Sequence, residues 1–259
     1  MALALVFVAL LALLSVNVAF AYDGTGQRPG ITDQAHKMHD LYLLVLAIGS
    51  IVFVAVEGAL IFILIRFRRR DDTLPAQTHG NNLLEVVWTS IPVIIVVILF
   101  VFSFITLVDV EDEGHEQDLT VDVTGFQWQW KFDLNSNDLG PNSDKSGENK
   151  TITILGTSSA EPTIVIPVNE NVQFRLHASD VIHSFYVQDF LYKLDVIPGR
   201  ENKFTVRATE TGTFPGQCAE FCGDDHALMR FHLKVVTRAE FDAWAAEQLA
   251  GSQTAAKQP

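Results

Sequence analysis

The stretch from Gly216 to Met229 concentrates the strongest metal-binding side chains of the sequence. It contains both cysteines of the protein, followed at short spacings by a histidine and a methionine: Cys218, Cys222, His226 and Met229. Thiolate, imidazole and thioether groups together favour copper over Mg²⁺, Ca²⁺ or Mn²⁺, and a methionine beside cysteine and histidine is typical of electron-transfer sites. The stretch therefore predicts a copper site, and Pro215, Gly216 and Gly223 predict that a loop carries it.

Two cysteines suit a pair of copper ions better than a single ion. A mononuclear blue-copper site uses one cysteine and two histidines, whereas two thiolates can both bridge two ions that share an electron. A second histidine is then needed, and we expect His183, which follows a predicted strand, with His177 as its competitor. His115 and His232 are weaker candidates. The alternative is a disulfide between Cys218 and Cys222, which an oxidising compartment would permit.

Two apolar segments in the first half are long enough to cross a membrane. Residues 41–65 and 86–108 each span more than the about 30 Å of a hydrocarbon core, at about 1.5 Å per helical residue. The arginines of residues 66–70 place the end of the first segment in the cytoplasm by the positive-inside rule, and acidic residues follow the second segment. We expect a transmembrane hairpin over residues 22–108, followed by an exported domain.

Residues 1–21 are an uncharged apolar run that ends in the small-x-small pattern of Ala19-Phe20-Ala21. This pattern predicts a secretory signal peptide. The run lacks a basic residue at its start, so an uncleaved additional transmembrane helix is the alternative.

The negative charge of the chain lies in its second half. Residues 1–108 carry six basic and seven acidic side chains, whereas residues 109–259 carry 12 and 24, so the formal charges are −1 and −12. Such an acidic surface argues against a nucleic-acid-binding protein. With two cysteines, the chain is also not a disulfide-dense secreted scaffold.

The exported domain is predicted over residues 109–250 as an all-β sandwich. Six short alternating runs indicate strands, at residues 119–123, 151–154, 163–166, 172–176, 203–206 and 231–235. Residues 135–150 are polar and turn-rich, which indicates a surface loop. Thr237 and Glu240 form a capping box that starts a short final helix, and residues 251–259 are expected to be a frayed tail.

Over nearly all its length, the chain resembles subunit II of cytochrome c oxidase, a haem-copper terminal oxidase. The resemblance is carried by the Gly216–Met229 stretch, by Ser179–Phe185, by Leu194–Arg200 and by Gly125–Phe132. It implies a cupredoxin-like Greek-key sandwich with a dinuclear copper centre, CuA. By this resemblance, Cys218 and Cys222 bridge the coppers, His183 and His226 are terminal ligands, and Met229 is a weak ligand. Glu220 would contribute its backbone carbonyl to copper and its side chain to a Mg or Mn ion shared with subunit I.

The resemblance also suggests roles for two residues outside the copper stretch. Trp128 would be the residue at which electrons enter. The alternative is core packing, because strand alternation would place Trp128 and Trp130 on one face. Glu85 would lie at the mouth of a proton path, although an acid at a helix start is also favoured by the helix dipole alone. Glu57, inside the first span, implies a neighbouring helix in the bilayer.

The function implied by this family is transfer of electrons from cytochrome c, through CuA, to haem in subunit I, where oxygen is reduced to water and protons are translocated. The expected partners are subunit I, subunit III and cytochrome c, and no nucleic acid. The expected location is a bacterial-type plasma membrane, in a multi-pass arrangement with the C-terminal domain outside. The alternatives are a quinol oxidase subunit II, which lacks copper, and a membrane-anchored copper-binding redox or assembly protein.

Overall fold

A computed structural model of the chain describes residues 27–69, 79–111, 117–136, 139, 150–157 and 160–255, with backbone alone from 251 to 255. Contacts divide these residues into two units, one from His39 to Asp109 and one containing the segment up to Met38 and the chain from Val110 onward. The signal peptide predicted over residues 1–21, the arginine Arg70 and His115 lie outside the described residues.

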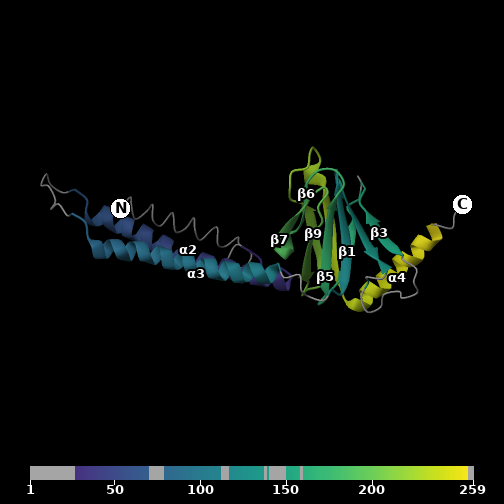
Figure 1. The fold of residues 1–259 in the computed structure, drawn as a ribbon, viewed down its shortest axis with the longest axis horizontal. Helices are drawn as coiled ribbons and strands as arrows, with labels where there is room; N and C mark the ends of the chain where they lie inside the picture. Colours follow the sequence, from purple (N-terminus) through teal and green to yellow (C-terminus); the bar gives the residue numbers. More distant parts are fainter. Residues whose placement is uncertain are drawn as a thin grey trace. The chain divides into compact units, whose positions relative to one another are not determined.

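Two long apolar helices correspond to the predicted spans (Figure 1). Helix α2 runs from Asp33 to Arg66 and helix α3 from Asn82 to Val110. Both are long and apolar enough to cross a membrane. The Asn81 side-chain oxygen caps α3 by accepting a hydrogen bond of 3.1 Å from the Leu84 N–H. Each helix extends beyond the predicted span, because its polar ends continue the same backbone hydrogen bonding.

The segment before α2 packs on the β-domain and belongs to the same unit. Ile31 is buried, and its backbone donates to the Asp189 carbonyl and accepts from the Thr209 N–H, both at 2.8 Å. Thr32 caps the helix start through a 3.0 Å bond from the Ala35 N–H. These contacts fasten the first turn of α2 to the β-domain.

The β-domain is a sandwich of two five-stranded sheets (Figure 1). The first sheet has the order β3-β2-β1-β5-β8, with bounds Thr151–Leu155, Gln129–Asn135, Leu119–Phe126, Asn171–Ala178 and Asn202–Arg207. The second has the order β4-β10-β9-β6-β7, with bounds Thr163–Pro167, Arg230–Val236, Gly212–Cys218, His183–Val187 and Tyr192–Val196. Most neighbouring pairs are antiparallel, but β1 pairs with β5 and β4 with β10 in parallel. The predicted sandwich is confirmed.

Aromatic rings fill the space between the two sheets. Trp130 and Phe231 are fully buried and lie 5.7 Å apart between ring centroids, and Phe185 stacks on Phe231 at 4.8 Å. Phe174 and Phe204 extend this cluster at 5.2 Å. Such closely packed rings bury large apolar areas and hold the two sheets in a fixed relation.

All six predicted strands are present. Of the four further strands, β2 overlaps the strand considered as an alternative at Trp128 and Trp130, and β6, β7 and β9 were not predicted. The prediction that Pro215 and Gly216 belong to a loop is wrong, because both lie within β9. Pro215 pairs with His232 of β10. The His232 N–H bonds to the Pro162 carbonyl, on the side of β10 that faces away from β9, so Pro215 and His232 exchange no hydrogen bonds and the missing N–H of the proline leaves none unmade there. Gly216 lies opposite Phe231, whose ring occupies the space of a side chain.

Helix α4, from Arg238 to Ala255, closes the fold beside β3 (Figure 1). The predicted capping box is confirmed, since the Glu240 carboxylate accepts hydrogen bonds of 2.9 and 2.7 Å from the Thr237 N–H and hydroxyl. Phe241 and Ala245 are buried against the sandwich. The helix continues to Ala255, into the stretch expected to be a frayed tail.

The position of Gly216 under Phe231 gives a stability prediction. A methyl group at Gly216 would overlap the Phe231 ring, so Gly216→Ala should lower the free energy of unfolding by about 1–3 kcal/mol, as overpacking does. Chemical denaturation of the full chain in detergent measures this. In the double variant Gly216→Ala/Phe231→Leu, the smaller side chain should recover part of the loss. A Gly216→Ala chain as stable as the unmodified chain would contradict the pairing of β9 with β10.

Candidate metal centre

The potential ligands come from the ends of three strands of one sheet. Cys218 is the last residue of β9, and Cys222 lies in the loop that follows. His226 begins the short helix η3, His226–Leu228, and Met229 directly precedes β10. His183 is the first residue of β6. The sequence prediction of a loop is thus correct for the residues after Cys218.

Strand pairing brings His183 to the cysteines. Phe185 pairs with Cys218 across β6 and β9, so His183, two residues earlier on the same face, lies diagonally opposite Cys218. All three side chains lie inside the domain: His183 is fully buried, and Cys218 and Cys222 are 4% and 5% exposed. Of the competing histidines, His177 lies on β5 with its Nε2 3.8 Å from Asp122 and 3.6 Å from Glu201. His232 lies 3.0 Å from Glu161.

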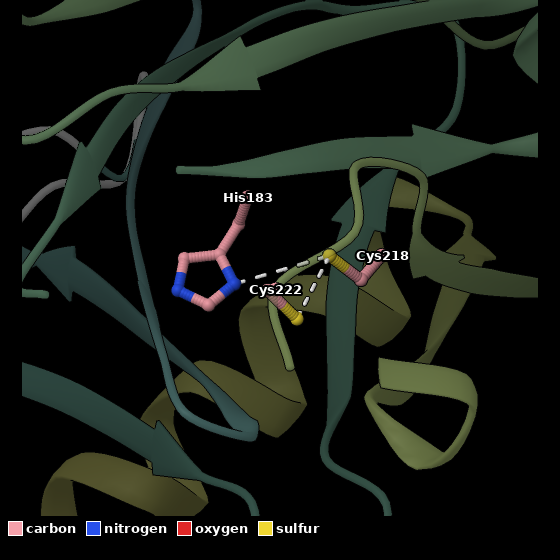
Figure 2. Close-up of side chains that lie close together, drawn as sticks. All are labelled: His183, Cys218 and Cys222. Carbon is pink, nitrogen blue, oxygen red and sulfur yellow. Dashed lines mark hydrogen bonds between the residues drawn. The ribbon is translucent and has the colours of Figure 1, made fainter. Parts of the chain in front are cut away.

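Figure 2 shows His183, Cys218 and Cys222 with their ligand atoms facing one another. The Cys218 Sγ lies 3.9 Å from the His183 Nδ1 and 3.8 Å from the Cys222 Sγ. The Cys222 Sγ in turn lies 3.6 Å from the His226 Nδ1 and 3.9 Å from the Met229 Sδ. The two sulfurs therefore lie at the centre of the cluster, with one imidazole beside each.

This donor set fits copper. Both cysteines are free thiols, and their separation far exceeds the about 2.05 Å of a disulfide bond. The ligand atoms of His183, Cys218 and Cys222 all lie within 4.8 Å of one another. Sulfur and imidazole donors at such distances can hold a soft metal ion, and the thioether of Met229 adds a ligand that is typical of copper.

The two thiols differ strongly in acidity. Burial alone would raise the pKa of Cys218, but hydrogen bonds from His183 and from backbone N–H groups outweigh burial and lower this pKa to about 6. Burial and the nearby Cys218 thiolate raise the pKa of Cys222 to about 12. Cys218 is therefore the more acidic of the two thiols, and its sulfur faces the His183 imidazole.

Asp180 fixes the orientation of His183, a role that sequence reasoning missed. Its carboxylate lies 2.8 Å from the His183 Nε2, which leaves Nδ1 directed at Cys218. Burial raises the pKa of Asp180, but hydrogen bonds from His183 and from the Gln127 and Val181 N–H groups keep it below its usual value. Burial likewise opposes protonation of His183, but Cys218 and Asp180 raise its pKa. In metal sites, a carboxylate commonly holds a histidine ligand in one orientation. The separation of three residues between Asp180 and His183 in the sequence could have indicated this contact.

The strand alternation assumed for the two tryptophans does not apply to Trp128, although its ring is also partly buried against the core. Trp128 lies in the turn between β1 and β2, whereas Trp130 is within β2 and fully buried. Both nevertheless reach the metal-binding stretch. The Trp128 indole N–H donates to the Cys222 carbonyl at 3.3 Å, and the Trp130 indole N–H donates to the Met229 carbonyl at 3.4 Å.

The two predicted acidic residues lie in different units. The Glu220 carbonyl oxygen is 3.3 Å from the Cys218 Sγ, and its side chain is exposed. Glu85 lies in the first turn of α3, in the other unit. The role of Glu85 at the mouth of a proton path and the Mg or Mn site expected at Glu220 stay predictions.

Two family matches cover most of the chain. Residues 119–236 match the family "Cytochrome C oxidase subunit II, periplasmic domain", and residues 23–106 match "Cytochrome C oxidase subunit II, transmembrane domain". A protein of Rickettsia bellii named "Probable cytochrome c oxidase subunit 2" is 40% identical over 219 residues, which are 84% of this chain and 80% of that relative. The "Cytochrome c oxidase subunit 2" of Alkalihalophilus pseudofirmus is 38% identical over 225 residues, covering 82% of this chain and 58% of that relative.

The comparison with solved structures gives a similar domain from another bacterium. The periplasmic domain of subunit II of cytochrome oxidase from Bradyrhizobium japonicum is 32% identical and covers 53% of this chain and 97% of its own, with a TM-score of 0.44.

The difference between the two thiols predicts selective chemistry in the copper-free chain. Iodoacetamide should modify Cys218 before Cys222, because the thiolate is the nucleophile, and the rate should fall as the pH is lowered through about 6. Peptide mapping by mass spectrometry at several pH values measures this. In His183→Ala, the midpoint should move to higher pH because a hydrogen bond to the thiolate is lost. Equal modification of both cysteines at neutral pH would contradict the prediction.

Proposed function

Because the chain belongs to the cytochrome c oxidase subunit II family, we propose that it accepts electrons from cytochrome c at a dinuclear copper centre, CuA, and passes them to haem in subunit I. Oxygen reduction to water and proton translocation then take place in that partner. The chain itself performs no bond chemistry.

The observation that carries this proposal is the arrangement of two sulfurs between two imidazoles. Cys218 and Cys222 are central, with His183 beside the first and His226 beside the second. We assign Cys218 and Cys222 as bridging ligands and His183 and His226 as terminal ligands, with the Met229 Sδ and the Glu220 carbonyl as weaker ligands. Bound copper would supply a one-electron acceptor that is shared by two ions.

Trp128 is the proposed residue at which electrons enter. It is partly exposed and lies on the side of the centre where its indole contacts the Cys222 backbone. Trp130 has no such exposure, since it is fully buried. Of the two rings, only Trp128 can therefore meet a partner in solution while touching a ligand residue.

The surface charge supports a basic electron donor. The second half of the chain carries a formal charge of −12, and Asp180, Glu220, Asp224 and Asp225 are exposed close to the ligand residues. An acidic surface steers a positively charged partner such as cytochrome c and raises its rate of association.

The remaining assignments follow from membership of the family. The chain is membrane-anchored, with its sandwich on the outer side. We propose a bacterial plasma membrane as its location and subunits I and III as its partners. The Glu220 side chain would bind a Mg or Mn ion shared with subunit I, and Glu85 would lie at the entrance of a proton path.

Two alternatives are less well supported. A quinol oxidase subunit II has lost the copper ligands, whereas this chain has a complete and clustered set. A copper carrier or assembly protein would use the thiols transiently, and its copper would be removed easily by a chelator.

Copper stoichiometry and electron paramagnetic resonance test the proposed centre. The full chain in detergent, loaded and oxidised, should bind two coppers that share one unpaired electron. Cys218→Ser or Cys222→Ser should abolish this signal because a bridging sulfur is lost. His177→Ala, a histidine outside the cluster, should leave it unchanged. Two coppers retained in either serine variant, or removal of copper by a weak chelator, would overturn the assignment.

The role of Trp128 predicts a kinetic effect. In the assembled oxidase, Trp128→Phe should slow electron transfer from reduced cytochrome c by about tenfold, because transfer depends on alignment of the donor with the centre. Stopped-flow spectroscopy measures the rate, and copper content should not change. The matched control is Trp244→Phe, on α4. An unchanged rate in Trp128→Phe would exclude the role.

A further inference from the structure

The turn that carries Trp128 is tied to both ligand-bearing loops through its neighbour Gln127. The Gln127 backbone N–H donates to the Asp180 carboxylate at 2.7 Å, and the same carboxylate holds His183. The Gln127 side-chain amide donates to the Cys222 carbonyl, also at 2.7 Å. Gln127 thus connects the β1–β2 turn to the loop between β5 and β6 and to the loop that follows β9.

A single carbonyl group receives two of these contacts. The Cys222 oxygen accepts from the Gln127 amide at 2.7 Å and from the Trp128 indole at 3.3 Å. The Gln127 bond is the shorter of the two and has the geometry of a full hydrogen bond, whereas the indole bond is long. The Gln127 hydrogen bond therefore holds the turn close enough to the Cys222 carbonyl for the Trp128 indole to bond to the same oxygen.

The next residue in the loop makes this approach possible. Gly223 has a φ of +124°, and a Cβ there would lie 3.1 Å from both the Gln127 Nε2 and the Trp128 Nε1. A side chain at this position would push the turn away from the Cys222 carbonyl. The loop is therefore shaped to receive the turn closely.

The contact matters because Cys222 is a proposed bridging ligand. From its carbonyl, the covalent path to the sulfur passes only through the carbonyl carbon, Cα and Cβ of the same residue. The Trp128 indole is thereby joined to a ligand sulfur by one hydrogen bond and one residue. Trp130 is the other ring that donates a hydrogen bond to the Gly216–Met229 stretch, and it is fully buried and bonds to Met229 instead of a cysteine.

We propose that Gln127 is a positioning residue for electron transfer, which holds Trp128 so that its hydrogen bond to the Cys222 carbonyl is the route from the indole to the copper centre. This inference rests on the proposed function. One electron leaves the ferrous haem of cytochrome c, which becomes ferric, and reduces the copper centre by one electron. No proton is transferred and no covalent bond breaks.

Variants of Gln127 test this in the full chain and the assembled oxidase. Gln127→Ala removes the amide, and Gln127→Glu keeps its size but replaces the donor with a negative charge. The control Gln129→Glu adds the same charge two residues away, at a side chain that lies next to Gly156 instead. In both Gln127 variants, transfer from reduced cytochrome c should slow by about threefold to tenfold, a loss typical of misalignment. The electron paramagnetic resonance signal of the copper centre should not change.

A readout without copper separates positioning from a general loss of structure. In the copper-free chain, hydrogen exchange should speed up in the peptide containing residues 125–130, where the Gln127 N–H is bonded to Asp180. Exchange in β5 and β10, and the midpoint of unfolding, should stay close to those of the unmodified chain. Widespread faster exchange would assign Gln127 a structural role and overturn the proposal.

A double variant decides whether Gln127 acts through Trp128. If both lie on one route, Gln127→Ala/Trp128→Phe should be no slower than Trp128→Phe alone, whereas independent effects would multiply. Multiplied effects, or an unchanged rate in Gln127→Ala while Trp128→Phe is slow, would overturn this inference and leave the proposed function standing. Absence of a dinuclear copper signal in the unmodified chain would instead overturn the proposed function, and this inference with it.

Discussion

The pairing of β6 with β9 is the constraint on which the centre depends. It places Phe185 opposite Cys218, and therefore His183 diagonally opposite the same cysteine. A shift by one residue would turn His183 to the other face of the sheet, because side chains alternate along a strand. The register is supported by the buried rings of Phe185 on β6 and Phe231 on β10, which stack at 4.8 Å although β9 lies between their strands. Hydrophobic packing in the middle of the sandwich thus determines the geometry at its end.

The same close packing explains the glycines around the site. Gly216 leaves room for the Phe231 ring, and Gly223 leaves room for Gln127 and Trp128. At Gly125 on β1, a Cβ would lie 3.2 Å from both the His183 and Trp130 rings. Each glycine lets the backbone of one element approach the side chains of another. Both sheets therefore contribute to a centre whose ligands come from one of them.

Charge is distributed differently inside and outside the domain. The surface is strongly acidic, and such charges remain solvated and screened by salt. Inside, burial opposes ionisation of Cys218, but a hydrogen bond from His183 lowers the pKa of this thiol, and His183 is in turn held by Asp180. Any charge on this buried thiol is therefore compensated locally, whereas the surface charge remains available to attract a partner. Because His183 lies between Cys218 and Asp180, an acidic thiol can be buried inside a domain whose net charge is also negative.

The sequence alone determined the features that depend on local chemistry and periodicity. These are the two apolar helices, six of the strands, the Thr237–Glu240 capping box and the candidate sulfur and imidazole ligands of residues 216–229, because each is encoded within a short stretch of chain. Only the tertiary structure decided which histidine meets the cysteines, that Pro215 and Gly216 lie in a strand, and that Trp128 and Trp130 have different surroundings. It also revealed the contacts of Asp180, Gln127 and the segment before α2. Each of these depends on strand register and packing between residues far apart in the chain, which a local pattern of residue types does not contain.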